Sequence, residues 1–284
     1  MLMSADPKAI KALALDLDGT ILGPGAVLSN RMISIVNKCM QRGLKIIINT
    51  GRSIEGAERF RASLGVEGLA IYCNGAVVAD MPHGGIVSSI LMDKKAADFC
   101  VSLSRETGVY CQIYFSDSGT RPRMDLVTEK DRPEREVYYK HTGILAEIGD
   151  LKKNLAERKQ KGCIKTMFIA EPESLEALRP KLEEGLGDSV YITRTQWNFL
   201  ELMNAGVSKG KGLEFAMDRL ALKMEEVIAF GDDENDIPML LAAGFSVAPS
   251  NAKENVKIHA NFIAGSNNDD GVAVFLEEFL DGKQ

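Results

Sequence analysis

The sequence is poor in the side chains that bind transition metals and in the apolar runs of membrane proteins. Its 284 residues include three histidines, and its five cysteines form no CxxC pair. An odd number of dispersed cysteines is typical of reduced thiols in a cytosol-like compartment and argues against a structural zinc site. No run reaches the roughly 18 apolar residues that a membrane-spanning helix requires. We therefore expect a cytoplasmic protein without a membrane partner.

The chain also carries no excess of positive charge. Lysine and arginine total 34 against 40 aspartates and glutamates, which gives a formal net charge of −6. Because binding to a nucleic-acid backbone requires clustered positive charge, nucleic acid is not an expected partner. The N-terminal segment contains Asp6 and Pro7 and lacks a basic stretch followed by an apolar one, so it does not resemble a secretion signal. No predicted strand is followed by GxGxxG, which argues against an NAD-dependent enzyme.

What the sequence does contain is a strand–helix rhythm at both ends. Apolar runs at residues 12–15, 44–48 and 69–73 are separated by two amphipathic helical patterns. This spacing predicts a βαβαβ unit with a parallel sheet. The rhythm returns after Val207, with a further strand at 227–230. With 45% hydrophobic residues, the chain is long enough for one large domain or two ordinary ones.

The middle of the chain follows a different pattern. Short apolar runs such as 124–128 and 137–139 lie between charged loops, which is typical of an antiparallel sheet with one solvated face. Helical patterns alternate with these runs. We therefore expect an α+β domain over residues 82–200, inserted into a domain formed by residues 1–81 and 201–284.

Polar turns follow three of the predicted strands. Asp16 and Asp18 follow the first, Thr50 and Gly51 the second, and the acidic run 232–236 a later one. In open α/β sheets, ligands bind beyond the carboxyl ends of the strands, so we expect these turns to converge on one site. A cluster of carboxylates without histidine or cysteine is an oxygen-lined site that suits Mg²⁺ better than zinc or copper.

A phosphate group in such a site needs hydrogen-bond donors, because carboxylates alone would repel it. Thr50 offers a hydroxyl, Gly51 an unobstructed N–H, and Ser53 begins a helix whose N-terminus favours anions. Lys209, at another predicted helix start, supplies a positive charge. These are the parts that a phosphoryl-transfer site requires.

Four short motifs, and the order in which they follow one another along the chain, resemble those of the haloacid dehalogenase superfamily. Residues 16–20 read DLDGT and look like the DxDGT motif, while NTGR at 49–52 and GVSKG at 206–210 are similar to the second and third motifs. GDDEND at 231–236 has the GDxxND form of the fourth. The long insertion between the second and third motifs, together with NGA at 74–76, is similar to the Cof-type branch with its large α/β cap.

The resemblance implies an α/β fold with a Rossmann-like parallel-sheet core and an inserted α+β cap that selects the substrate. It also implies a Mg²⁺-dependent phosphatase that hydrolyses small phosphorylated metabolites, such as sugar phosphates, through an aspartyl-phosphate. The sequence departs from the Cof-type pattern at Asn204, where proline is common, and at Pro249 and Ser250, where Met-Gly is usual. These departures concern loop shape and spare the motif residues.

Carried over by position, the resemblance gives each motif residue an expected role. Asp16 would be the nucleophile and Asp18 the acid/base. The carboxylates of Asp16 and Asp232 and the backbone carbonyl of Asp18 would hold Mg²⁺. The groups expected to bind phosphate are the amides of Leu17 and Asn235, together with Thr50, Gly51 and Lys209. Asp236 would orient Lys209 or a metal-bound water.

Two other functions stay open on the sequence. A phosphomutase resembling phosphomannomutase would have a similar core and cap and would need a bisphosphate activator. A non-catalytic phosphometabolite-binding protein would keep the fold, although the complete set of motif residues argues against it. His83, His141 and His259 are expected to be structural or exposed. The expected partner is a small phosphorylated metabolite, and the expected assembly is a monomer or small homo-oligomer.

Overall fold

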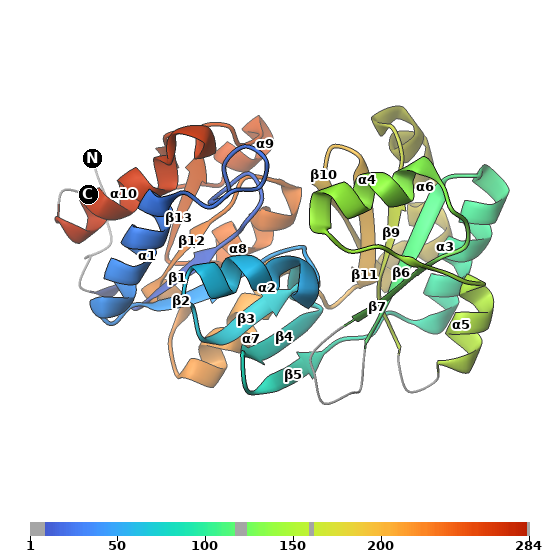
Figure 1. Cartoon of the computed structure of the whole chain (residues 1–284), viewed down its shortest axis with the longest axis horizontal. Helices are drawn as coiled ribbons and strands as arrows, with labels where there is room; N and C mark the ends of the chain where they lie inside the picture. The colour runs from blue at the N-terminus through green and yellow to red at the C-terminus, as the bar shows by residue number, and fades with distance from the viewer. Residues whose placement is uncertain (1–8, 117–123, 159–161, 283–284) are drawn as a thin grey trace.

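The computed structural model describes residues 9–116, 124–158 and 162–282. Two halves lie side by side, as Figure 1 shows: one contains both ends of the chain, and the other contains its middle. We call them the core half, built on a five-stranded sheet, and the cap half, built on a six-stranded sheet. No helix in the described ranges has the length and apolar character needed to cross a membrane.

The core half is built around a parallel sheet. Its strands are β1 (Ala12–Leu15), β2 (Lys45–Ile48), β12 (Val227–Phe230), β13 (Phe245–Pro249) and β14 (Phe262–Ala264). They pair in the order β14-β13-β12-β1-β2, all parallel, so strands from both ends of the chain are neighbours. The prediction of an α/β fold with a parallel-sheet core is confirmed.

Helices cover both faces of this sheet. They are α1 (Asn30–Gln41), α2 (Ile54–Ser63), α7 (Lys209–Leu220), α8 (Ile237–Ala242), α9 (Glu254–Lys257) and α10 (Gly271–Leu280). Leu13 and Leu15 of β1 belong to the apolar cluster that includes α1 and α10, whereas Ala12 and Ala14 belong to the cluster that includes α7 and α8. Both faces of β1 are therefore buried, which explains its uninterrupted apolar sequence.

A three-stranded antiparallel sheet corrects one expectation. The run 69–73 does not add a strand to the parallel sheet. Instead, β3 (Gly68–Tyr72) pairs antiparallel with β4 (Val77–Met81), which pairs with β5 (Gly85–Ser89). The chain reverses within a short turn after β3, and a turn this short permits only an antiparallel neighbour. A parallel bridge between Asn49 and Ile71 links β3 to the end of β2.

The cap half is an α+β unit, as the sequence predicts for the inserted segment. Its strands are β6 (Tyr110–Ser116), β7 (Met124–Thr128), β8 (Glu147–Ile148), β9 (Cys163–Ile169), β10 (Val190–Gln196) and β11 (Phe199–Asn204). They pair in the order β10-β11-β9-β6-β7-β8, antiparallel except for β7 with β8. One apolar cluster joins this sheet to α3 (Lys94–Thr107), α5 (Leu151–Glu157) and α6 (Pro172–Leu186).

The run 137–139, expected to be a strand, lies in helix α4 (Pro133–Thr142). Proline is favoured in the first turn of a helix, and Gly143, with φ of 78°, ends this one. The buried residues of α4 are Tyr138 and Thr142, one helical turn apart. Of the run 137–139, Tyr138 therefore faces the interior, whereas Val137 and Tyr139 are exposed.

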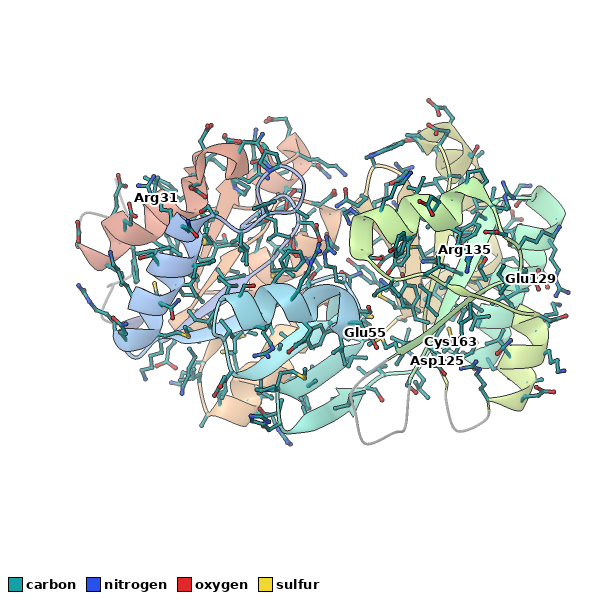
Figure 2. All side chains as sticks on the ribbon, in the orientation of Figure 1. Arg31, Glu55, Asp125, Glu129, Arg135 and Cys163 are labelled. Carbon is teal, nitrogen blue, oxygen red and sulfur yellow. The ribbon has the colours of Figure 1, made fainter. Side chains whose placement is uncertain are left out.

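The exact domain boundaries stay a prediction. β5 pairs with β4 of the core half, and β11 pairs with both β9 and β10 of the cap half. Strand pairing thus favours junctions just after β5 and just after β11, slightly later than residues 82 and 200. Glu55 lies where the halves meet (Figure 2), and its carboxylate accepts a hydrogen bond from the backbone N–H of Met124.

Candidate active site

The turns that follow β1, β2 and β12 meet at one edge of the sheet, because β1 lies between the other two strands. Lys209 Nζ lies 2.5 Å from Asp16 Oδ1 and 2.5 Å from Asp236 Oδ1. Thr20 Oγ1 donates to Asp232 Oδ1 at 2.7 Å, joining the first turn to the last. The convergence expected from the sequence is therefore present in the structure.

Lys209 is positioned from two sides. It is the first residue of α7, whose N-terminus is capped by the Ser208 hydroxyl. Asn49, at the end of β2, donates to the carbonyl oxygen of Lys209 at 3.0 Å. Burial alone would lower the pKa of Lys209, but the carboxylates of Asp16 and Asp236 outweigh burial and raise that pKa. The buried ammonium is therefore charged.

Asp16, Asp232 and Asp236 form an acidic cluster in which one oxygen of each lies within 4.8 Å of the others. Burial, reinforced by repulsion from Asp236, raises the pKa of Asp16 to about 8 and the pKa of Asp232 well above its usual value. With all three carboxylates ionised, as a bound cation would favour, the one ammonium of Lys209 leaves a formal excess of two negative charges, which matches a divalent cation. Because the donors are hard oxygens, the cluster fits Mg²⁺.

The three carboxylates are not equivalent. Asp236 is engaged on both oxygens: Oδ1 by Lys209, and Oδ2 by the backbone N–H groups of Asp232 at 2.8 Å and Asp233 at 3.0 Å. Within the described residues, Asp16 and Asp232 each have an Oδ2 atom that accepts no hydrogen bond. Asp16 and Asp232 are thus the carboxylates able to hold a cation, whereas both oxygens of Asp236 are engaged by protein groups.

The Asp18 carboxylate lies outside this cluster. It accepts hydrogen bonds from Arg52 Nε at 2.6 Å and Nη2 at 2.7 Å, and His141 Nε2 lies 3.8 Å away. Burial favours the neutral acid, but Arg52 outweighs burial and lowers the pKa of Asp18. The carboxylate is therefore ionised. The metal contact expected from Asp18 involves its backbone carbonyl and stays a prediction.

The expected phosphate-binding groups lie around the same place. Thr50, Gly51 and Asn235 line a pocket together with Asp16, and Lys209 is buried beneath it. No acceptor in residues 9–116, 124–158 or 162–282 takes a hydrogen bond from the N–H of Gly51 or of the buried Leu17. These two N–H groups are available to an anion.

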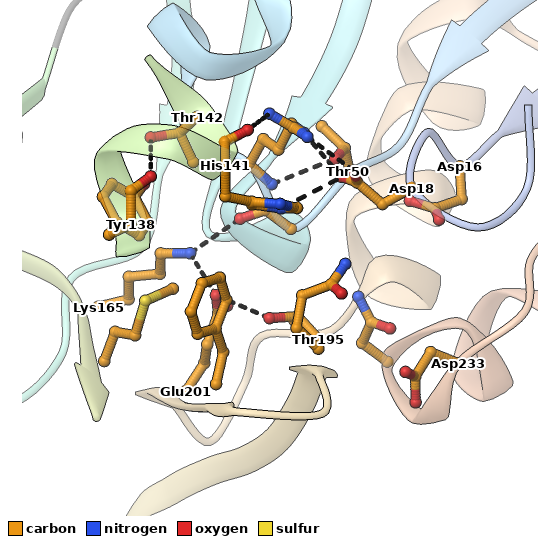
Figure 3. Close-up of a pocket in the computed structure, with 16 residues that line it drawn as sticks. Asp16, Asp18, Thr50, Tyr138, His141, Thr142, Lys165, Thr195, Glu201 and Asp233 are labelled. Carbon is orange, nitrogen blue, oxygen red and sulfur yellow. Dashed lines mark hydrogen bonds and ion pairs between the residues drawn. The ribbon is translucent and has the colours of Figure 1, made fainter. Parts of the chain in front are cut away.

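The opposite wall of the pocket comes from the cap half (Figure 3). Its side chains are Tyr138, His141, Thr142, Lys165, Met167, Thr195, Gln196, Phe199 and Glu201. His141, expected to be structural or exposed, instead lines the pocket, because α4 turns it toward Asp18. Lys165 and Glu201 line the pocket as well, although no sequence motif predicts them. Their detectable signal is a charged residue inside each of two apolar strands, where charge is rare unless it is paired.

Comparison with known proteins agrees with this geometry. The model of the haloacid dehalogenase-like hydrolase family matches residues 13–276. The pyridoxal phosphate phosphatase YbhA of Escherichia coli is 28% identical over 282 residues, which cover 95% of this chain and 98% of the relative. The 5-amino-6-(5-phospho-D-ribitylamino)uracil phosphatase YitU of Bacillus subtilis is 27% identical over 278 residues, covering 94% of this chain and 97% of the relative.

A solved structure shares the fold over both halves. BT1666 from Bacteroides thetaiotaomicron, described among phosphatases of the haloalkanoate enzyme superfamily, gives a TM-score of 0.78 at 26% identity and covers 98% of each chain. With a family match that spans most of the sequence and motif residues that meet in one pocket, the chain belongs to the haloacid dehalogenase-like hydrolase family, in its Cof-type branch.

Proposed function

We propose that this protein is a Mg²⁺-dependent phosphatase that hydrolyses a small phosphorylated metabolite through an aspartyl-phosphate on Asp16. The observation that carries the proposal is the buried contact of Lys209 with Asp16 and Asp236, at 2.5 Å each, beside Asp232. Relatives that align over nearly their whole length are named phosphatases, which supports the reaction class. The cap half is proposed to close over the site and select the leaving group.

The covalent chemistry falls to Asp16 and Asp18. An oxygen of Asp16 attacks phosphorus while the bond to the leaving oxygen breaks, and Asp18 gives that oxygen a proton. Asp18 then takes a proton from the water that attacks the aspartyl-phosphate, which releases inorganic phosphate and restores Asp16. Because Arg52 holds Asp18 ionised, the structure corresponds to the proton-accepting form. Proton donation requires Arg52 to withdraw.

The remaining motif residues bind the phosphoryl group. The proposed donors to its oxygens are Lys209, the Thr50 hydroxyl and the N–H groups of Leu17, Gly51 and Asn235. Mg²⁺, held by Asp16, Asp232 and the Asp18 carbonyl, would offset the repulsion between the carboxylates and the phosphate. Asp236 keeps the Lys209 ammonium aimed at the site.

The pocket wall from the cap half favours a leaving group with a ring. The Phe199 ring packs against those of Tyr138 and His141, with centroid distances of 6.0 Å and 5.6 Å, and all three side chains line the pocket. Aromatic side chains pack well against flat or apolar ring faces. The relatives named above act on pyridoxal phosphate and on a phosphoribityl uracil, both ring compounds. We therefore place ring-bearing phosphate monoesters beside sugar phosphates as candidate substrates.

Phosphate release tests the proposal. We would assay these compounds with Mg²⁺ and with a chelator, using wild type, Asp16→Asn and Asp98→Asn. Asp98 is the control, because its side chain is 45% exposed on α3 in the cap half. We expect Mg²⁺-dependent release by wild type and by Asp98→Asn, and none by Asp16→Asn. Wild-type release by Asp16→Asn would overturn the nucleophile assignment. Phosphoryl transfer to a sugar that needs a sugar bisphosphate would move the assignment to a mutase.

A further inference from the structure

A buried ion pair of the cap half touches the phosphate-binding loops of the core half. Lys165 on β9 and Glu201 on the adjacent β11 are each 1% exposed, and Lys165 Nζ lies 2.8 Å from Glu201 Oε1. Removing two charges from water costs free energy that good geometry and further hydrogen bonds must offset. The chemistry proposed above uses neither side chain, so the contacts of the pair indicate its role.

Lys165 reaches Thr50 through a single peptide group. Its Nζ donates to the carbonyl oxygen of Gly51 at 2.8 Å, and the N–H of the same peptide group, which belongs to Arg52, donates to Thr50 Oγ1 at 3.1 Å. Because a peptide group is planar, holding its carbonyl also holds its N–H. Thr50 Oγ1 thus accepts one hydrogen bond and keeps its own hydrogen for an anion.

Glu201 reaches the loop after β12. Its Oε2 accepts a hydrogen bond from Asn74 Nδ2 at 2.8 Å, and Asn74 Oδ1 accepts one from Asn235 Nδ2 at 2.9 Å. The backbone N–H of Asn74 also donates to the carbonyl oxygen of Thr50 at 3.1 Å. One carboxylate from the cap half therefore connects the Thr50 loop with the Asn235 loop, the two segments proposed to bind the phosphoryl oxygens.

The hydrogen bonds of both side chains go to protein groups. The ammonium of Lys165 donates to Gly51 and Glu201 and lies 4.5 Å from the ring centroid of Tyr114. Glu201 accepts from Lys165, from Asn74 and from Thr195 Oγ1 at 3.1 Å. Figure 3 shows the pair at the pocket wall, with its dashed contacts directed to protein groups.

We propose that Lys165 and Glu201 are positioning residues, through which docking of the cap half orients the two phosphate-binding loops. The inference rests on the proposed function. Its consequence is that the phosphate site is complete only when the cap half is docked, so closure over the substrate and assembly of the donors are one event.

The test uses the full chain and the double variant Lys165→Met/Glu201→Gln. This variant removes both charges at nearly constant volume and leaves no single charge buried without a partner. The matched control is Arg179→Met, which breaks an ion pair between the two halves, to Glu234 at 3.0 Å, where the Arg179 side chain is 33% exposed. Thermal unfolding checks that each variant is folded.

A second variant, Asn74→Gly, tests the same network in a chain that keeps the ion pair. Asn74 has a left-handed backbone with φ of 56°, which glycine adopts without strain. The substitution removes the side-chain link between Glu201 and Asn235, together with the 3.7 Å contact of Asn74 Nδ2 with Met203 Sδ. The comparison therefore stays informative if the double variant does not fold.

Two measurements are made on every variant. Turnover is followed with p-nitrophenyl phosphate and with pyridoxal phosphate, and binding of inorganic phosphate in the presence of Mg²⁺ is followed by calorimetry. We expect kcat/KM to fall about 10- to 100-fold in the double variant, by the same factor for both substrates, because the donors are misplaced. Binding of inorganic phosphate should weaken in the double variant and in Asn74→Gly, whereas Arg179→Met should stay within about twofold of wild type.

Two results would overturn the inference. A fall in kcat/KM for pyridoxal phosphate alone would show that the pair recognises the leaving group. Unchanged binding of inorganic phosphate in both the double variant and Asn74→Gly would show that the pair does not orient the phosphate-binding loops. If wild type binds inorganic phosphate but hydrolyses neither compound, the phosphatase proposal fails, while the binding comparison still decides the role of the pair.

Discussion

Replacing Lys209 with methionine should strongly destabilise the protein. The ammonium is fully buried, 2.5 Å from an oxygen of Asp16 and 2.5 Å from an oxygen of Asp236. Removing one partner of a buried ion pair costs about 3–5 kcal/mol, because the remaining charge stays buried and unpaired. At about 2–4 °C per kcal/mol, the unfolding midpoint should fall by roughly 6–20 °C.

A second substitution should restore part of this loss. In wild type, Asp16→Asn removes one of two partners of Lys209, whereas in Lys209→Met it removes a carboxylate that has lost its cation. Asp16→Asn should therefore raise the unfolding midpoint of Lys209→Met, and the effects of the two substitutions should not add.

Lys211→Met is the matched control for Lys209→Met. Lys211 lies on the same helix, is 64% exposed and pairs with Glu214 at 2.9 Å. A surface ion pair of this kind contributes about 0–1 kcal/mol. Thermal and urea unfolding, without Mg²⁺ and at fixed pH, give the stability of Lys209→Met, Asp16→Asn, their combination and Lys211→Met. Equal losses of stability in Lys209→Met and Lys211→Met would refute the argument from buried charge. A further loss of stability when Asp16→Asn is added to Lys209→Met would also refute it.

Gly19→Ala should weaken Mg²⁺ binding by about 10- to 100-fold, because its Cβ would lie 2.2 Å from Asp232 Oδ2. Gly25→Ala, at a similar positive φ but in open space, should leave that affinity unchanged, as the Mg²⁺ dependence of the unfolding midpoint would show. Mg²⁺ at about a hundred times its Kd should add about 2.7 kcal/mol to the free energy of unfolding of wild type. The same Mg²⁺ concentration should not change the free energy of unfolding of Asp232→Asn. An increase equal to that of wild type would argue against the acidic cluster as the binding site. All five cysteines are free and buried, and burial raises the pKa of the Cys73 and Cys163 thiols to about 12. A thiol reagent at mildly alkaline pH should therefore label none until the protein is unfolded, and rapid labelling of the native protein would contradict the burial.

The core half was predictable because its features are local in the sequence. Asp16 and Thr50 each follow a short apolar run, and the carboxyl ends of neighbouring parallel strands share one edge of a sheet. The run 69–73 shows the limit of this reasoning, because an apolar strand does not specify its neighbour. A short turn after Tyr72, with Asn74 in the left-handed region, made that neighbour antiparallel.

The pocket wall of the cap half was not predictable, for a physical reason. A motif residue that carries the proposed chemistry lies in a short segment after a strand or at a helix start, so its type and its place are visible in the sequence. Lys165 and Glu201 instead act on other protein groups: Lys165 meets Gly51 across 114 positions, and Glu201 meets Asn74 across 127. Such contacts depend on the register of β9 with β11 and on how the halves dock, and neither follows from local pattern. The chemistry of this enzyme is therefore encoded in short segments of sequence, whereas the coupling of that chemistry to the cap half is encoded in contacts that only the fold creates.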